Sequence, residues 1–214
     1  MSCKRDEKTF DQGYGYYPLT INHYKIYNVQ KISYSILDTI YENYQIKEII
    51  TDTFTQGGRL KYRLERFKRN SASDAWPFTP DSVWTVFLGE SKLVKTESNV
   101  PYIKLVFPVE KGVSWNGNGE NAKGKDDYEY EWKEKNYTVN NHYFANTISV
   151  LQSPNDSNKV KKDYRKEVFA DGVGLIYKIK ETYDYQQKDG AAVPGYKIDN
   201  GIKYYERIES YGQE

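Results

Sequence analysis

The stretch from Tyr44 to Phe67, YQIKEIITDTFTQGGRLKYRLERF, decides the fold class. In its second half Leu60, Tyr62 and Leu64 alternate with charged residues, which is typical of a half-buried antiparallel strand. Gln56-Gly57-Gly58 separates this strand from the one before it, and paired glycines suit the tight turn of a β-hairpin. The stretch therefore predicts two antiparallel strands joined by a short turn.

Strand patterns continue on both sides of this hairpin. Turns are predicted at Gly89-Glu90 and at Asp199-Asn200-Gly201, because Asn-Gly suits a type I′ turn. The apolar phase shifts between Val29 and Ile32, which predicts a bulge there. The residues 142–151 could also form a short helix. The other predicted strands cover residues 23–37, 82–88, 91–95, 102–109, 136–138, 163–170, 175–179, 196–198 and 202–208.

Two segments between these strands are predicted to be loops. Residues 69–81 are rich in Ser, Asn, Asp and Pro, and residues 116–131 combine glycines with a mixed-charge run, so we interpret the second as a long mobile connection. About ten strands and little helix give an all-β prediction: an antiparallel barrel, a half-barrel with a curved sheet, or a sandwich.

Composition limits the possible functions. The chain has 214 residues, a net charge of +1 and 22 tyrosines. Duplex binding needs clustered excess positive charge, so we expect no nucleic-acid partner. The tyrosines must supply much of the core, because they bury a ring and keep a hydroxyl hydrogen-bonded. The longest apolar runs are far shorter than a membrane-spanning helix.

The N-terminus suggests a lipid anchor. Cys3 is the only cysteine, and the charged run Lys4 to Lys8 follows it. A small residue before a cysteine is how a bacterial lipoprotein signal ends, and we interpret Met1 as replacing a removed signal. Residues 1–12 are then a flexible tether, residues 13–214 a single β domain, and Cys3 the lipidated residue in the native protein.

Two motifs carry a family resemblance. Tyr17-Pro18-Leu19 before a Tyr-rich strand, and the segment Glu167 to Ile176, resemble small Bacteroidetes-type envelope lipoproteins with curved β-sheets. The resemblance implies a fold and a compartment, the bacterial cell envelope and its outer membrane, but no activity. The charged run after Cys3 is similar to tethers that mark such lipoproteins for the outer face. The same bacteria glycosylate Asp-Ser/Thr-apolar triplets, which implies candidate glycosylation sites at Thr39 and Ser82.

Familiar catalytic machinery is not found. His23 and His142 have no further ligand at metal-binding spacing, so neither a metal site nor a cofactor is expected. No phosphate-binding loop or dinucleotide motif occurs. Carboxylates are plentiful between residues 126 and 131, and any two could form an acid–base pair in space. We expect a protein that is not an enzyme, with a carboxylate-based hydrolase as the least supported alternative.

The many aromatic residues either form a ligand-binding surface or fill the hydrophobic core. Of the four tryptophans, Trp76 and Trp115 lie in predicted loops, so they are the candidate contact residues. The preferred hypothesis is a lipid-anchored protein that binds an apolar small molecule or a peptide on a concave sheet face. The alternative is a carbohydrate-binding module in which exposed Trp and Tyr stack on sugar rings. An unknown small molecule, a glycan or a protein is therefore the expected partner.

Overall fold

A computed structural model describes residues 11–155, 160–188, 191–192 and 197–214. Within these ranges the chain is almost entirely antiparallel β, with one short 3-10 turn, η1, at Tyr14–Tyr16. The strands are β1 His23–Tyr34, β2 Thr39–Gln56, β3 Arg59–Arg69, β4 Ser82–Leu88, β5 Lys92–Glu97, β6 Val100–Val106, β7 Ser114–Asn116, β8 Asp127–Val139, β9 His142–Asn155, β10 Lys161–Ala170, β11 Gly174–Tyr185, β12 Gln187–Lys188, β13 Ala191–Ala192 and β14 Ile198–Gln213.

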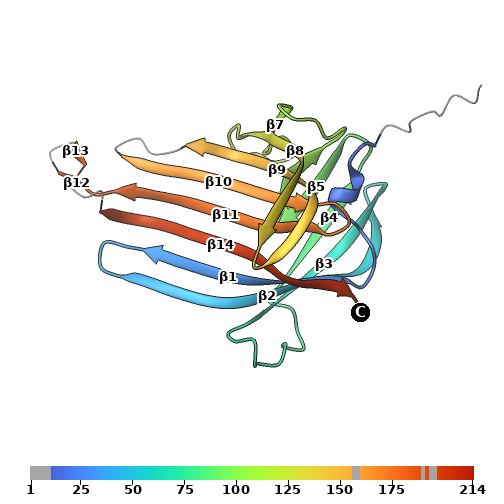
Figure 1. Cartoon of the computed structure of the whole chain (residues 1–214), viewed down its shortest axis with the longest axis horizontal. Coiled ribbons are helices and arrows are strands. Elements are labelled where there is room, and N and C mark those ends of the chain that lie inside the picture. Colours follow the sequence, from blue (N-terminus) through green and yellow to red (C-terminus); the bar gives the residue numbers. More distant parts are fainter. Residues whose placement is uncertain (1–10, 156–159, 189–190, 193–196) are drawn as a thin grey trace, which may run out of the picture.

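Twelve of these strands form one sheet, in the order β6-β5-β4-β3-β2-β1-β14-β11-β10-β9-β8-β7. Strands β1 to β6 make one meander and β7 to β11 a second. The last strand, β14, joins them because it pairs with β1 on one side and with β11 on the other (Figure 1). The predicted antiparallel barrel or half-barrel of about ten strands is confirmed.

The two ends of this sheet meet, so the barrel is nearly closed. The Ile103 N–H of β6 donates to the Gly117 carbonyl after β7, over 2.9 Å. The Trp115 indole N–H of β7 donates to the Ile103 carbonyl, also over 2.9 Å. The Tyr130 hydroxyl of β8 accepts from the Val106 N–H and donates to the Val106 carbonyl. Backbone groups that an open sheet would leave unpaired at its edge are thereby satisfied.

The N-terminal segment packs against one end of the barrel. Tyr16 and Tyr17 are each only 3% exposed, and the Gly172 N–H donates to the Gly15 carbonyl over 2.9 Å. The Tyr14 ring packs edge-on against Phe107, with their centroids 4.6 Å apart. Tyr16 and Tyr17 belong to the hydrophobic core, whose other side chains include Tyr27, Leu64, Val86, Leu105, Ile148 and Phe169.

The hairpin predictions have mixed outcomes. Gly57 and Gly58 form the two-residue turn between β2 and β3, with φ of 61° and 73°. In contrast, the hairpin predicted at residues 199–201 is wrong, since β14 runs straight through it. Gly201 pairs with Tyr34 of β1 and with Tyr183 of β11. Asn200 pairs with Asp184 of β11 alone, and the register with β11 shifts at Asp199, so the strand continues through the Asn-Gly signal with one irregularity.

Two further predictions need correction. The predicted mobile connection is too long, because β8 begins at Asp127 and hydrogen bonds organise the residues before it. The Asn118 side chain, for example, donates to the Gly124 carbonyl over 2.6 Å. The bulge predicted in β1 at residues 29–32 is not found; the register instead shifts opposite Ile26 and Tyr27, where Glu209 of β14 is the unpaired residue. The residues 142–151 are strand, as part of β9.

Candidate functional site

The inner face of the barrel carries charged residues at positions where the strand pattern calls for apolar ones. In β2, Glu48 lies between Ile46 and Ile50, and in β3, Arg66 follows Leu64 at the two-residue spacing that keeps side chains on one face. Lys25 of β1 shares its face with Tyr27 in the same way. The buried charged residues of the inner strands are Lys25, Glu48, Lys95, Lys104, Glu167 and Glu206, each no more than 7% exposed.

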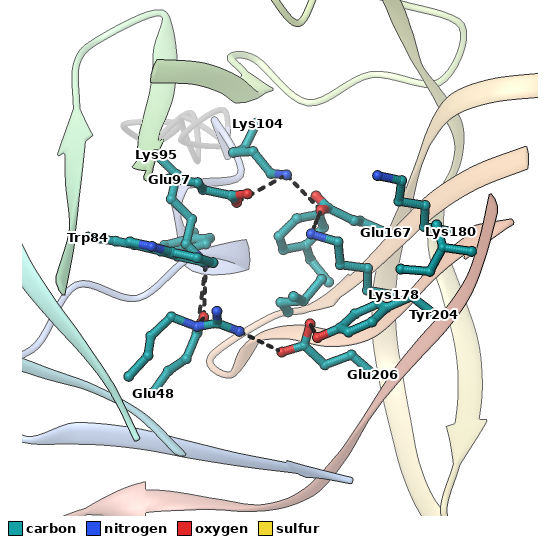
Figure 2. Close-up of a pocket in the computed structure, with 15 residues that line it drawn as sticks. Glu48, Trp84, Lys95, Glu97, Lys104, Glu167, Lys178, Lys180, Tyr204 and Glu206 are labelled. Atoms are coloured by element: carbon teal, nitrogen blue, oxygen red, sulfur yellow. Dashed lines mark hydrogen bonds and ion pairs between the residues drawn. The ribbon is translucent and has the colours of Figure 1, made fainter. Parts of the chain in front are cut away.

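All of these side chains except Lys25 line a cavity of about 230 Å³ inside the barrel (Figure 2). Tyr17, Phe169 and Leu175 line it from the end that the N-terminal segment covers. Lys180, which also lines the cavity, is an exposed residue. The charged lining consists of five cations, Arg66, Lys95, Lys104, Lys178 and Lys180, and four carboxylates, Glu48, Glu97, Glu167 and Glu206.

One group of ion pairs is centred on Arg66. Its Nε lies 2.9 Å from Glu48 Oε1, and its Nη2 lies 3.6 Å from Glu206 Oε1. Lys95 Nζ lies 3.1 Å from the same Glu48 oxygen. The Arg66 guanidinium also lies over the Trp84 ring, 3.9 Å from its centroid. Two carboxylates, two cations and an indole are therefore in mutual contact in the wall of the cavity.

A second group of ion pairs is centred on Lys104. Its Nζ lies 2.6 Å from Glu167 Oε1 and 3.6 Å from Glu97 Oε1, and Figure 2 shows it reaching between the two carboxylates. Lys178 Nζ lies 3.2 Å from the same Glu167 oxygen. Lys180 differs from these cations, since no ion pair joins it to any residue in the described part of the chain.

Burial and the ion-pair network shift the pKa values of two carboxyl groups, those of Glu48 and Glu206, in opposite directions. Burial would raise the pKa of Glu48, but Lys95, Arg66 and Lys25 outweigh it and lower the pKa to about 2. Burial raises the pKa of Glu206, and the negative charge of Glu48 adds to the rise against the pull of Arg66. Glu48 is therefore the ionised partner of Arg66, and Glu206 is the carboxyl that protonates more readily.

Several polar atoms in the cavity wall have no hydrogen-bond partner among the described residues. Apart from Arg66 Nε, which is ion-paired with Glu48, the donors are the Trp84 indole N–H and the Tyr17 hydroxyl. The acceptors are Glu167 Oε2 and Glu206 Oε1, and the second of these has only the ion-pair contact of 3.6 Å to Arg66. A buried polar group without a partner costs about 1–3 kcal/mol, so such groups call for water or a ligand. Four of them around one cavity define a site for something that both donates and accepts hydrogen bonds.

A second cavity of about 150 Å³ adjoins the first. It shares Glu97, Lys104, Lys178 and Lys180 with the first cavity, so the two are neighbouring compartments of one interior. The buried Gln152 lines the second, and its Nε2 lacks a partner among the described residues. The polar interior therefore extends from Arg66 past Lys104 to β9.

The predicted contact residues do not lie in this cavity. Trp76 is half-buried in the β3–β4 connection, where the Arg69 guanidinium lies over its ring at 4.1 Å. Trp115 lies in β7 and not in a loop, and its ring packs 4.7 Å from that of Tyr130. The connection and β7 lie on opposite sides of the molecule in the view of Figure 1. The tryptophan that lines the cavity, Trp84, was not selected from the sequence.

The sequence also named candidate residues for glycosylation, lipidation and acid–base chemistry. Thr39 and Ser82 are half-buried at the starts of β2 and β4, and their glycosylation stays a prediction. Cys3 lies outside the described residues. Asp126 is bound by Arg165 through two contacts of 2.7 and 2.8 Å, outside the Arg66 and Lys104 groups. The carboxylates that do meet in the barrel, such as Glu48 and Glu206, come from distant strands.

The described residues contain neither a cluster of metal ligands nor a membrane-spanning helix. No group of three or more His, Cys, Asp or Glu residues there could hold a metal ion. In that same part of the chain, no helix has the length and apolar character needed to cross a membrane.

No protein-family model matches this chain, and no curated protein matches its sequence. Among solved structures, it is similar to a protein described as exported, with a YMCC-like fold, from Bacteroides fragilis NCTC 9343. The identity is 8%, 92% of this chain and 98% of that chain are covered, and the TM-score is 0.48. It is also similar to a protein described as a lipoprotein, from Parabacteroides distasonis ATCC 8503, with 11% identity, the same coverage and a TM-score of 0.43. Likenesses this distant carry no argument about what this chain binds.

Proposed function

We propose that this protein is a non-enzymatic binding protein that holds a small polar molecule inside its barrel, and that a lipid on Cys3 anchors it to the outer membrane. The unpartnered polar atoms around the interior cavity carry the binding part of the proposal. The lipoprotein-like N-terminus and the sequence resemblance support the anchor. The charged lining favours a polar ligand over the apolar one that the sequence suggested.

The unpartnered atoms indicate the chemistry of the ligand. Glu206 Oε1 and Glu167 Oε2 need a donor, and an ammonium group would also offset the raised pKa of Glu206. The Trp84 N–H needs an acceptor, and Lys180, which lies on the opposite side of the cavity in Figure 2, offers a free cation. A molecule with an ammonium group at one end and a carboxylate at the other meets both needs. Free amino acids and dipeptides are the simplest members of this class.

Thermal unfolding with L-amino acids and dipeptides as probes tests this proposal. A ligand at one hundred times its Kd stabilises by about 2.7 kcal/mol, which raises the Tm of a protein of this size by about 5–10 °C. Trp84→Phe keeps a ring but removes the indole donor, so it should lose most of that shift. Lys111→Gln changes an exposed lysine away from the cavity and should keep it. If no probe shifts the Tm by more than about 1 °C, which corresponds to less than about 0.5 kcal/mol, the cavity binds none of them and the proposal fails.

One observation favours a second candidate, the carboxylate-based hydrolase. Glu48 and Glu206 both contact Arg66 and have pKa values pushed in opposite directions, as acid–base pairs do. A structural ion-pair network produces the same separation. To distinguish a binding protein from a hydrolase, a dipeptide that raises the Tm is recovered after incubation and its mass is measured by mass spectrometry. An intact dipeptide supports binding alone, and cleavage that Glu206→Gln abolishes supports the hydrolase.

A further inference from the structure

A second hollow lies on the outer side of the barrel and differs in chemistry from the interior. It has a volume of about 370 Å³ and is lined by Asn28, Val29, Gln30, Asn43, Tyr44, Gln45, Asn70, Ser71, Ala72, Asn140 and Arg207. Six of these side chains are uncharged amides, and Arg207 is the only charged residue among them. We call this hollow the amide groove.

Strand register places the amides in rows across the sheet. Asn28 of β1 lies opposite Arg207 of β14 and opposite Gln45 of β2, which in turn lies opposite Arg69 of β3. Two residues further along β1, Gln30 lies opposite Tyr205 and Asn43. Because side chains two residues apart share a face, both rows project to the same side. Four adjacent strands span roughly 14 Å, which is longer than one sugar ring.

Hydrogen bonds fix the orientation of the first row. Arg69 donates from Nε and Nη2 to Gln45 Oε1, over 2.8 and 2.6 Å. Gln45 Nε2 then donates to Asn28 Oδ1 over 2.7 Å, and Asn28 Nδ2 donates to Glu209 Oε2 over 2.5 Å. Asn28 therefore keeps one donor and one acceptor position in fixed directions, and Gln45 keeps one donor. A site organised before binding loses less entropy when its ligand arrives.

Two chain segments form the walls of the groove. Asn70, Ser71 and Ala72 come from the β3–β4 connection, and a hydrogen bond from the Ser71 N–H to Asp74 Oδ2 (2.9 Å) holds this wall. Asn140 comes from the β8–β9 turn and donates to the Ile208 carbonyl over 3.1 Å. The walls therefore join parts of the chain that are far apart in sequence.

Aromatic rings lie at both ends of the first row. Trp76 lies against Arg69 at one end, with 4.1 Å between the guanidinium carbon and the ring centroid. At the other end Arg207 lies 5.0 Å from the Tyr205 centroid and 5.8 Å from that of Tyr177. These half-buried rings add apolar surface beside the polar groove. The less polar face of a sugar ring packs on such aromatic surface.

We propose that the amide groove binds a neutral carbohydrate. An amide side chain both donates and accepts, so it pairs with neighbouring hydroxyls, whose oxygens do the same. Gln30, Asn43 and Asn70 have no side-chain hydrogen bond to any described residue, so their amides are available to such hydroxyls. A peptide strand is less suited to this place. It would need an unpaired sheet edge, whereas β1, β2 and β14 are each paired on both sides here.

A glycan array carrying neutral gluco-, manno-, galacto- and xylo-oligosaccharides, with sulfated and uronic-acid glycans beside them, tests the proposal. We expect retention on neutral glycans. The triple variant Gln30→Ala, Asn43→Ala, Asn70→Ala should bind the best of them at least tenfold more weakly by calorimetry. These three side chains carry no described hydrogen bond, so the variant should fold.

A matched control and a third variant make the outcome decisive. Asn136→Ala with Asn200→Ala removes two exposed amides that are not in the groove lining and should change the affinity less than twofold. Trp84→Phe alters the interior cavity and should leave glycan binding unchanged, which separates this inference from the proposed function. The proposal is overturned by retention of charged glycans alone, by no retention at all, or by equal affinity of the triple variant and the parent protein.

Discussion

Arg66 shows what a single interior residue does in this barrel. It contacts Glu48 and Glu206 and lies over the Trp84 ring, so it joins three strands besides its own. A buried ion pair offsets the cost of removing its charges from water only while every partner is present. The two carboxylates around Arg66 therefore differ in importance, because one is held ionised and the other protonates more readily.

Glutamine substitutions at these two positions should separate their roles. At pH 7, Glu48→Gln leaves Arg66 and Lys95 without their main anion and should cost about 3–5 kcal/mol. Glu206→Gln resembles the protonated carboxyl that burial favours and should cost less than about 1 kcal/mol. Urea unfolding monitored by tryptophan fluorescence measures both losses. Equal losses would show that the two carboxylates do not differ in ionisation.

The same pair predicts a pH dependence. The pKa of Glu48 falls from 4.5 to about 2 on folding, so its contribution is complete above pH 4.5 and is lost as the pH falls towards 2. The difference between the parent protein and Glu48→Gln should therefore shrink over that window. The raised pKa of Glu206 has the opposite sign: its carboxyl weakens the fold as the pH rises above 4.5, and Glu206→Gln removes that loss.

At the scale of the element, β14 is the strand on which the sheet depends. It pairs with β1 along one edge and with β11 along the other, and so connects the two meanders. Gly201 is the first residue of β14 that pairs with β1 and also pairs with Tyr183 of β11, and its φ is 130°. A Cβ there would lie 2.4 Å from the Thr182 carbonyl oxygen and 2.4 Å from the Tyr183 Cα. Backbone atoms cannot move aside as a flexible side chain can.

Gly201→Ala should therefore destabilise the protein by about 2 kcal/mol or more, through backbone strain and displacement of β11. Gly124→Ala is the matched control, since its Cβ would meet no atom within 4 Å. It should change the stability by no more than about 0.5 kcal/mol. Thermal unfolding compares the two variants. Similar Tm values would mean that β14 does not pass between its neighbours at this point.

At the scale of the whole molecule, the important feature is closure of the sheet. The seam between β6 and the β7–β8 edge rests on few bonds, among them the two between the Tyr130 hydroxyl and the Val106 backbone. The Tyr130 side chain is fully buried, so water cannot replace them. The enclosed polar interior exists only because this seam is closed.

Tyr130→Phe should open the seam locally. Loss of the hydroxyl leaves the Val106 N–H and carbonyl unpaired, at a cost of about 1–3 kcal/mol. Hydrogen exchange at β6 should then become at least about tenfold faster, while exchange in β1 and β14 changes little. Tyr128→Phe is the control, because no described residue bonds to that hydroxyl and the ring remains buried. Faster exchange at β6 in Tyr128→Phe, or an unchanged rate in Tyr130→Phe, would contradict this account of closure.

The sequence by itself determined the class of fold and most of the local hairpins. The alternation of Leu60, Tyr62 and Leu64 and the paired glycines at 57 and 58 depend only on neighbouring residues. The strand and the turn are found as predicted, although Leu60 is exposed and only Leu64 is fully buried. The same alternation continues to Arg66, and this signal could have placed a charge inside the barrel. An inward arginine conflicts with an apolar core, however, and its carboxylate partners lie on β2 and β14.

Only the tertiary structure decided the site. Glu48, Arg66, Lys104 and Glu206 come from four strands spread along the chain, and closure of the sheet brings them together. The Asn-Gly signal at residues 200 and 201 failed for a related reason: pairing with neighbouring strands outweighs a local turn preference. Local patterns act over a few residues, whereas the cavity and the amide groove arise from strand order and register. Those depend on the packing of the whole chain.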